Sequence, residues 1–156
     1  GTEEGVKEPQ TTFSSCFGAP FLPLHPTKYA EMLGSKIKKD KMNVWLINTG
    51  WSGGPYGVGE RIELKYTRAI ITAALTGGLD NAGYVKDEIF GLAKPKSCNG
   101  VPAEILDPEN TWEDKHAYNA KANELALAFV NNFNKFKEFA NREIMEAAPK
   151  PGKIIV

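Results

Sequence analysis

The pattern of apolar and polar positions predicts three helices. The first should run from Thr27, which would cap it, to about Lys39, because the apolar side chains in between fall close to helical spacing. The second should cover about Tyr66 to Leu75 and end at Gly77-Gly78, since glycine is the usual residue just past a helix C-terminus. The apolar positions of the first helix are Tyr29, Met32, Leu33 and Ile37.

The third predicted helix begins within residues 111–114, with Thr111 as its cap. Apolar side chains then recur along one helix face: Ala122, Leu125, Ala126, Phe129, Val130, Phe133 and Phe136. Each large side chain in such a stripe contributes about 1.5–3 kcal/mol when it is buried. We therefore expect the stripe to form core or a seam between domains, and not a cofactor site.

Between the first two helices, the apolar run Asn43–Asn48 predicts a short buried strand. A glycine-rich loop follows, and then a short extended piece over Arg61–Leu64. Residues 79–110 are less regular, with 89–92 either a strand or a docked loop. So much irregular chain is unusual in an independent domain. The pattern predicts a mixed α/β (α+β) piece that packs on a larger body.

The glycine loop indicates a ligand edge. Five glycines lie within residues 50–59, at a cost in chain entropy that suits backbone bending around a ligand. The spacing excludes a phosphate-binding P-loop, because Glu60 follows the last glycine where lysine is required. It also fails the dinucleotide-binding pattern, since Ile62 stands at the third glycine position. An ordinary surface turn is the alternative interpretation.

Two side chains beside this loop are candidates for ligand contacts. The flat guanidinium of Arg61 can stack on an aromatic base and still donate hydrogen bonds. Thr67 lies near the predicted start of a helix, where its hydroxyl either caps the helix or contacts the ligand.

The composition limits the kinds of partner and ligand that the chain is expected to bind. The 156 residues make up one domain's worth of chain, and a formal net charge of zero argues against nucleic acid as the main partner. The basic cluster at Lys36–Lys41 is expected to be a solvated helix end. His25 and His116 lie far apart, and Cys16 and Cys98 lack the spacing of a zinc site, so we expect no metal site within these residues and require no disulfide.

The expected location is the cytoplasm. The sequence has no apolar run of membrane-spanning length and no recognisable signal peptide, and it does not end in a peroxisomal signal. Two cysteines suit a reducing compartment.

Six short blocks carry a family resemblance. They are Thr12–Phe21 (TFSSCFGAPF), Leu24–Ala30 (LHPTKYA), Asn48–Trp51 (NTGW), Tyr66–Ile71 (YTRAII), Leu106–Trp112 (LDPENTW) and Phe129–Phe133 (FVNNF). In order and spacing these blocks resemble the C-terminal part of ATP-dependent phosphoenolpyruvate carboxykinases, over roughly residues 1–148.

The resemblance implies a reaction and a layout. Such enzymes decarboxylate oxaloacetate and transfer the γ-phosphoryl group of ATP to the enolate, giving phosphoenolpyruvate, ADP and CO₂ in gluconeogenesis, with Mg²⁺ and Mn²⁺ as metal cofactors. Some relatives work in organelles. Residues 1–20 would form an active-site lid and entry strand, and residues 149–156 a tail. Residues 21–148 would be the C-terminal part of the mononucleotide-binding domain, a lobe incomplete without the upstream chain.

The resemblance also assigns residues. The adenine side of the ATP site falls on Arg61, Ile62 and Thr67. The lid, from about Glu8 to Phe17, includes Thr11, Thr12, Phe13, Ser14 and Ser15. Many family members carry lysine where this chain has Glu60, so the resemblance gives position 60 no phosphate role.

The family's phosphate loop, metal ligands and oxaloacetate-binding arginine belong upstream of Gly1, so the resemblance places no catalytic residue here. The expected partners are ATP, oxaloacetate and the N-terminal remainder of the enzyme, and the chain alone should be inactive. The alternative is a non-catalytic module that binds adenine nucleotide or regulates a partner.

Overall fold

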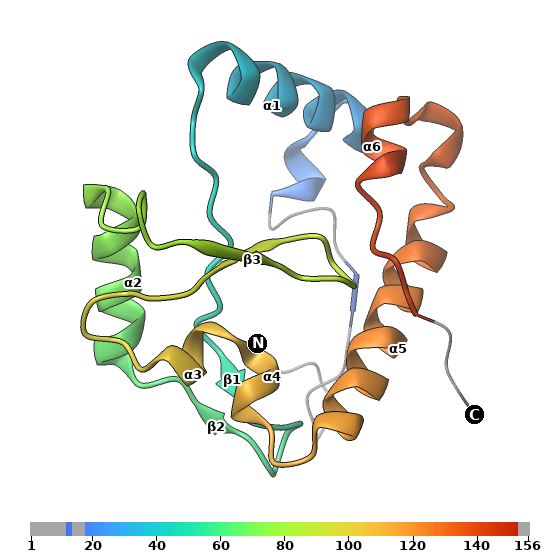
Figure 1. The fold of residues 1–156 in the computed structure, drawn as a ribbon. Coiled ribbons are helices and arrows are strands. Elements are labelled where there is room, and N and C mark those ends of the chain that lie inside the picture. Colours follow the sequence, from blue (N-terminus) through green and yellow to red (C-terminus); the bar gives the residue numbers. More distant parts are fainter. Residues whose placement is uncertain (1–11, 14–17, 153–156) are drawn as a thin grey trace.

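The computed structural model describes residues 12–13 and 18–152 and has a mixed α/β architecture. Helix α1 (Pro26–Asp40) lies at one end, and α2 (Leu64–Thr76) and α5 (Lys115–Phe133) lie on opposite sides (Figure 1). None of the helices in this part of the chain combines the length and hydropathy needed to span a bilayer.

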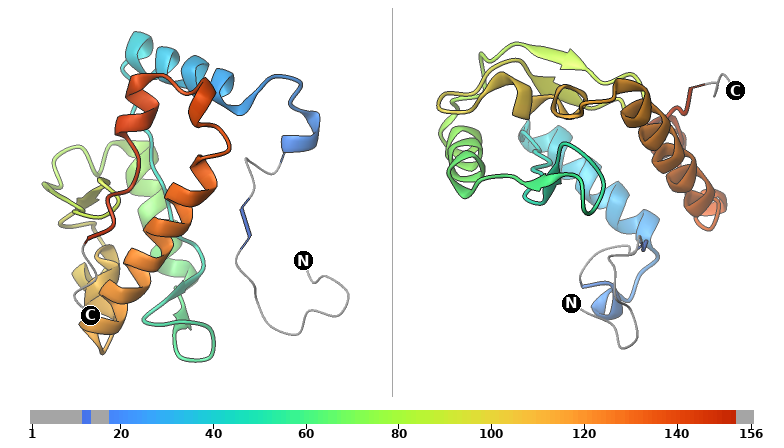
Figure 2. Two further views of the ribbon diagram at one scale, coloured as in Figure 1. Left: turned by 90° about the vertical axis from the view of Figure 1, so that its right-hand side faces the viewer. Right: turned by 90° about the horizontal axis from the view of Figure 1, so that it is seen from below.

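Two separate two-stranded antiparallel sheets complete the architecture. Strand β1 (Trp51–Ser52) pairs with β2 (Glu60–Arg61), and β3 (Tyr84–Lys86) pairs with β4 (Ala93–Pro95). The β3–β4 hairpin and the two short helices after it, α3 (Ala103–Leu106) and α4 (Pro108–Thr111), span the distance between α2 and α5 (Figures 1 and 2). The other short helices are η1 (Ala19–Phe21), η2 (Lys137–Phe139) and α6 (Arg142–Glu146).

The three predicted helices are present, but two of the predicted caps are wrong. Helix α1 is capped by the imidazole of His25, which accepts a hydrogen bond from the Thr27 N–H at 3.4 Å, while Thr27 itself is buried in the first turn. Helix α5 is capped by Asp114, whose carboxylate accepts from two backbone N–H groups. Thr111 ends the separate helix α4 instead. The C-cap at Gly77 is confirmed, with φ of +77°.

Helix α1 is joined to the C-terminal segment. The ring of His25 lies 4.6 Å from Phe139 and 5.8 Å from Phe136. At the other end of the helix, Lys38 donates to Glu143 of α6 at 2.7 Å, and Figure 2 shows the two segments side by side. This ion pair is exposed and adds at most about 1 kcal/mol. The basic cluster at this helix end is solvent-exposed, as predicted.

The strand predicted at Asn43–Asn48 is not formed. The segment is irregular, and Val44 and Leu46 are 58% and 78% exposed. A β-strand requires a hydrogen-bonded neighbour, and among the described residues this segment pairs with none. The extended piece predicted at Arg61–Leu64 is also shorter than expected, because α2 already begins at Leu64.

Residues 79–110 are more ordered than predicted, since they contain the β3–β4 hairpin. Residues 89–92 belong to its loop and not to a strand. The Asp87 carboxylate accepts hydrogen bonds from the N–H groups of Ile89 and Phe90, and Gly91 adopts φ of +69°. Such an aspartate turn stabilises the tip of the hairpin locally.

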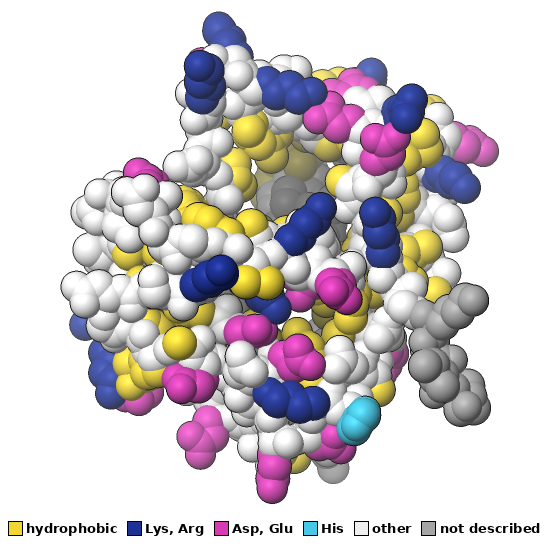
Figure 3. All heavy atoms as spheres, in the orientation of Figure 1, with side chains coloured by type: hydrophobic (Ala, Val, Ile, Leu, Met, Phe, Trp, Pro, Cys, Tyr) yellow, Lys and Arg dark blue, Asp and Glu magenta, His cyan; other side chains and the backbone are white. Residues whose placement is uncertain are grey.

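The apolar core of the described residues is small. Leu79, Cys98, Ala122 and Ala126 are its fully buried apolar members. In the stripe on α5 the two alanines are covered, but Leu125 and Phe129 remain 39% and 43% exposed. Apolar side chains lie open among charged ones on the face drawn in Figure 3. A chain of this length normally buries a larger core, so the exposed apolar surface indicates contacts beyond these residues.

Candidate functional site

The glycine loop closes a short β-hairpin. Trp51 lies opposite Arg61, and Ser52 opposite Glu60. The Ile62 N–H donates to the Gly50 carbonyl at 2.9 Å and extends the pairing. The loop passes so close to itself that a Cβ atom on Gly59 would lie 2.5 Å from the Gly54 carbonyl oxygen and 2.6 Å from that of Ser52. Only glycine fits at position 59, so the glycine pattern builds this hairpin directly.

A hollow of about 390 Å³ lies beside the hairpin. Arg61 and Ile62 line it, together with residues of the glycine loop. Tyr66, Ile105 and Thr111 add side chains from α2, α3 and α4. Arg61 is exposed and Ile62 half-buried, so the hollow offers an open guanidinium next to an apolar patch.

Thr67, the third predicted contact, lies elsewhere. It is the fourth residue of α2, is 7% exposed, and is not among the residues that line the hollow. The capping interpretation of Thr67 is wrong, because Glu63 occupies the N-cap position of α2. Its neighbour Tyr66 reaches the hollow in its place.

Both acidic and basic side chains lie near Arg61 in the sequence. Glu60 is exposed next to it. Beyond it, Lys65 forms an exposed ion pair with Glu63 at 2.7 Å and lies 4.6 Å above the ring of Tyr66. The hydrogen bonds with Glu63 and Tyr66 raise the pKa of Lys65, so it stays cationic at neutral pH. The two carboxylates, Glu60 and Glu63, balance the two cations, Arg61 and Lys65, so this rim has no surplus of positive charge for a phosphate group.

Thr111 is a site residue that the sequence analysis assigned to another role. Its hydroxyl accepts hydrogen bonds from the Ser52 hydroxyl at 3.0 Å and from the Gly53 N–H at 3.1 Å. It donates to the Pro108 carbonyl at 2.7 Å. Thr111 therefore ties α4 to the start of the glycine loop, a contact between residues 59 positions apart in the chain.

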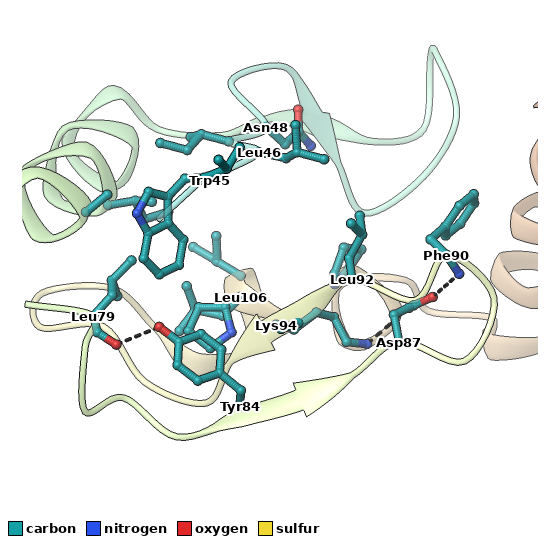
Figure 4. Close-up of a pocket in the computed structure, with 18 of the residues that line it drawn as sticks. Trp45, Leu46, Asn48, Leu79, Tyr84, Asp87, Phe90, Leu92, Lys94 and Leu106 are labelled. Carbon is teal, nitrogen blue, oxygen red and sulfur yellow. Dashed lines mark hydrogen bonds and ion pairs between the residues drawn. The ribbon is translucent and has the colours of Figure 1, made fainter. Parts of the chain in front are cut away.

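A second, larger hollow of about 970 Å³ lies between residues 43–48, α2 and the β3–β4 hairpin (Figure 4). Its wall is mostly apolar, with Trp45 lying 6.3 Å from the ring of Tyr84. The Tyr84 hydroxyl donates to the Leu79 carbonyl at 2.6 Å, which fixes one side of the hollow. Ile62 and Ile105 line both hollows, so the two share a wall.

Lys94 is the cation of the larger hollow. It lies 2.8 Å from Asp107 and 3.5 Å from Asp87, and only 20% of its side chain is exposed. Burial opposes its charge, but the hydrogen bond to Asp107 and the charges of both aspartates outweigh burial and raise the pKa of Lys94. The ion pair joins the β3–β4 hairpin to the start of α4.

Replacing Lys94 by methionine is expected to lower the free energy of unfolding by about 2 kcal/mol, because two half-buried carboxylates lose their counter-ion. Since the pKa of Lys94 is raised above its ordinary 10.5, its contribution is complete below that pH and disappears only as the pH rises through the folded value. Urea unfolding of Lys94→Met at pH 6–9 should therefore give a constant loss. The exposed Lys96→Met is the control, and an equal loss in both variants would contradict the account.

Comparison with known proteins shows which family the chain belongs to. The profile described as phosphoenolpyruvate carboxykinase matches residues 1–104. The chain is 66% identical over 149 residues to the phosphoenolpyruvate carboxykinase (ATP) of Flavobacterium johnsoniae, and 59% and 53% identical over 150 residues to those of Caldanaerobacter subterraneus and Thermus thermophilus. Each match covers 96% of this chain.

The chain belongs to the phosphoenolpyruvate carboxykinase family. It spans between a quarter and a third of the length of these relatives, 28% for Flavobacterium johnsoniae and 29% for Caldanaerobacter subterraneus. The mixed α/β architecture is that of a fragment of a carboxykinase.

Of the lid predicted by the carboxykinase resemblance, Thr11, Ser14 and Ser15 lie outside the described residues. Thr12 and Phe13 are exposed, and the Phe13 ring packs edge-on against Phe129 of α5 at 5.2 Å. Cys16 also falls outside the described residues.

Within residues 12–13 and 18–152, His, Cys, Asp and Glu side chains nowhere gather in a group of three or more that could hold a metal ion. His25 is used as a helix cap, and His116 is exposed on α5. Cys98 is buried, and burial raises the pKa of its thiol. The described residues therefore provide no such ligand set for the divalent cations of a carboxykinase.

Proposed function

We propose that this chain forms the adenine side of the ATP site, and the lid, of an enzyme that decarboxylates oxaloacetate and phosphorylates the product with ATP. The reaction gives phosphoenolpyruvate, ADP and CO₂. Family membership supports the reaction class, and the relatives' names specify ATP. The observation that carries the role of this chain is the hollow beside the glycine hairpin, which Arg61 and Ile62 line together.

In this proposal each residue has a limited task. The Arg61 guanidinium lies against the face of the adenine ring, where a flat cation is attracted by the π-electrons. Ile62 packs at the edge of the base, while Thr67 is buried in α2 outside the lining of the hollow and Tyr66 takes the place beside the base. Glu60 and Glu63 balance the charges of Arg61 and Lys65, so this rim offers the triphosphate no surplus of positive charge. The phosphates, Mg²⁺, Mn²⁺ and oxaloacetate are then bound by the remainder of the enzyme, while the lid excludes water.

The remainder of the enzyme is the expected partner, and the larger hollow is its docking surface. The hollow is mostly apolar, and its rim includes residues 43–48, whose backbone has no strand partner among the described residues. Because the relatives are more than three times as long as this chain, chain from the remainder is available to cover the hollow. Pairing with residues 43–48 would satisfy their backbone and bury Leu46.

Calorimetric titration with ATP tests the proposal. The polypeptide completed to the length of its relatives should bind ATP and convert oxaloacetate to phosphoenolpyruvate. The 156-residue chain should bind ATP at least tenfold more weakly and show no turnover, because it holds only one wall of the site. If the 156-residue chain instead unfolds cooperatively and binds ATP as tightly as the completed polypeptide does, the chain is an independent nucleotide-binding module.

A further inference from the structure

Thr111 ends the four-residue helix α4, and two of its three side-chain hydrogen bonds reach outside that helix. Its bond to the Pro108 carbonyl, at 2.7 Å, is the ordinary local bond of a threonine in a helical turn. Its two other bonds reach out of the helix, to the Ser52 hydroxyl and to the Gly53 N–H. A hydroxyl offers one donor and two acceptor positions, so all three are occupied, and two of them bind the glycine loop.

The two loop contacts lie where the loop leaves β1. Gly53 has φ of +83°, and a Cβ atom there would lie 3.2 Å from the Thr111 carbonyl oxygen, so the loop backbone approaches α4 closely. Ser52 is paired with Glu60 of β2, the residue before Arg61. Fixing Ser52 and Gly53 therefore also holds the strand that carries Arg61, through the pairing of β1 with β2.

Helix α4 is itself held in place. Asp107, at its N-cap, accepts the hydrogen bond from Lys94 of β4 at 2.8 Å. Thr111 and Ile105 line the same hollow of about 390 Å³ as Arg61 and Ile62. The segment 105–111 thus contributes Ile105 and Thr111 to the lining of the hollow that Arg61 and Ile62 also line.

We infer that Thr111 is a positioning residue for nucleotide binding, because its hydroxyl fixes the glycine loop and thereby the strand that presents Arg61 to the adenine ring. The inference rests on the proposed function. Thr111 has no contact with the reacting atoms in this scheme. Removal of its hydroxyl should therefore weaken ATP binding and leave the chemical step intact.

Two substitutions at Thr111 separate its hydroxyl from its shape. Thr111→Val keeps the volume and removes all three hydrogen bonds, whereas Thr111→Ser keeps the hydroxyl. In the completed polypeptide, Thr111→Val should raise the KM for ATP about tenfold, because two of the lost hydrogen bonds fix the loop and each contributes about 0.7 kcal/mol. Thr111→Ser should stay within about twofold of wild type. In both variants kcat and the KM for oxaloacetate should change less than about twofold.

Ser52→Ala provides a graded comparison. It removes one of the two loop bonds and leaves the Gly53 bond in place, so the KM for ATP should rise only about threefold to fivefold. Equal effects of Thr111→Val and Thr111→Ser would overturn the inference, since they would point to packing and not to the hydroxyl. A fall in kcat with an unchanged KM for ATP would also overturn it.

Amide exchange distinguishes failure of this inference from failure of the proposed function. In the same polypeptide without nucleotide, the Gly53 amide should exchange about tenfold faster in Thr111→Val than in wild type, and normally in Thr111→Ser. Unchanged exchange at Gly53 in Thr111→Val would show that the hydroxyl does not fix the loop. If exchange accelerates but the wild-type polypeptide binds no ATP, the loop contact is real, the proposed function is wrong, and the positioning role falls with it.

Discussion

Replacing Arg61 by alanine is expected to raise the KM for ATP about thirtyfold in the polypeptide completed to the length of its relatives. The guanidinium is exposed on the wall of the smaller hollow, and its stacking on adenine in a partly desolvated site contributes about 2 kcal/mol. The KM for oxaloacetate should change little, because the proposal places that substrate on the remainder of the enzyme. Steady-state kinetics with each substrate varied in turn measures both effects.

Arg68→Ala is the matched control for this substitution. Arg68 is an exposed arginine on α2, seven positions further along, and it is not among the residues that line either hollow. Its removal takes away the same charge and should leave the KM for ATP within about twofold of wild type. If the KM for ATP rose equally in Arg61→Ala and Arg68→Ala, Arg61 would act only through its positive charge. That result would contradict stacking on the adenine ring.

Replacing Leu46 by aspartate should destabilise the completed polypeptide by more than about 3 kcal/mol, yet change the stability of the 156-residue chain by less than about 0.5 kcal/mol. Leu46 is 78% exposed in this chain, where a charge costs little. It lines the larger hollow, so docking of the remaining chain would bury the new carboxylate. Urea unfolding of both forms gives the two values.

Leu75→Asp provides the comparison for Leu46→Asp. Leu75 is 82% exposed in the last turn of α2 and does not line the larger hollow. The account predicts that this second leucine tolerates aspartate in both forms of the protein. Equal tolerance of aspartate at positions 46 and 75 in the completed polypeptide would mean that the larger hollow is not the docking surface.

Local signals in the sequence predicted the helices well. Periodic apolar positions and the glycines at 77 and 78 located α1, α2 and α5 to within a few residues. The caps at His25 and Asp114 were assigned to nearby threonines, because several polar side chains next to a helix start satisfy the same local pattern. Only the three-dimensional path of the chain decides which one reaches the free N–H groups.

Features that depend on distant contacts were harder to predict. The run Asn43–Asn48 has the pattern of a strand, but a strand forms only where a neighbouring strand pairs with it, and the described residues supply none. The β3–β4 hairpin was missed because its tip is stabilised by the Asp87 turn, which is a signal in one residue and not a repeating pattern.

The candidate site was predictable in part. The glycine run marked the loop that joins β1 to β2, and Arg61 and Ile62, which follow it, line one hollow. The place of Thr67 inside α2 depends on where that helix begins, which the pattern set two residues too late. Thr111 gave no local sign of its contact with Ser52 and Gly53, because the contact joins segments far apart in the chain.

Photolabelling with 8-azido-ATP tests whether this chain holds the adenine, because the reactive azide sits on the adenine ring itself. The completed polypeptide would be irradiated with the analogue, digested and mapped by mass spectrometry, with excess ATP as competitor. If this chain holds the adenine, the label should fall within residues 59–67 or within residues 105–111, and excess ATP should suppress it. Labelling that ATP suppresses but that falls only outside these two segments would contradict the claim that this chain holds the adenine.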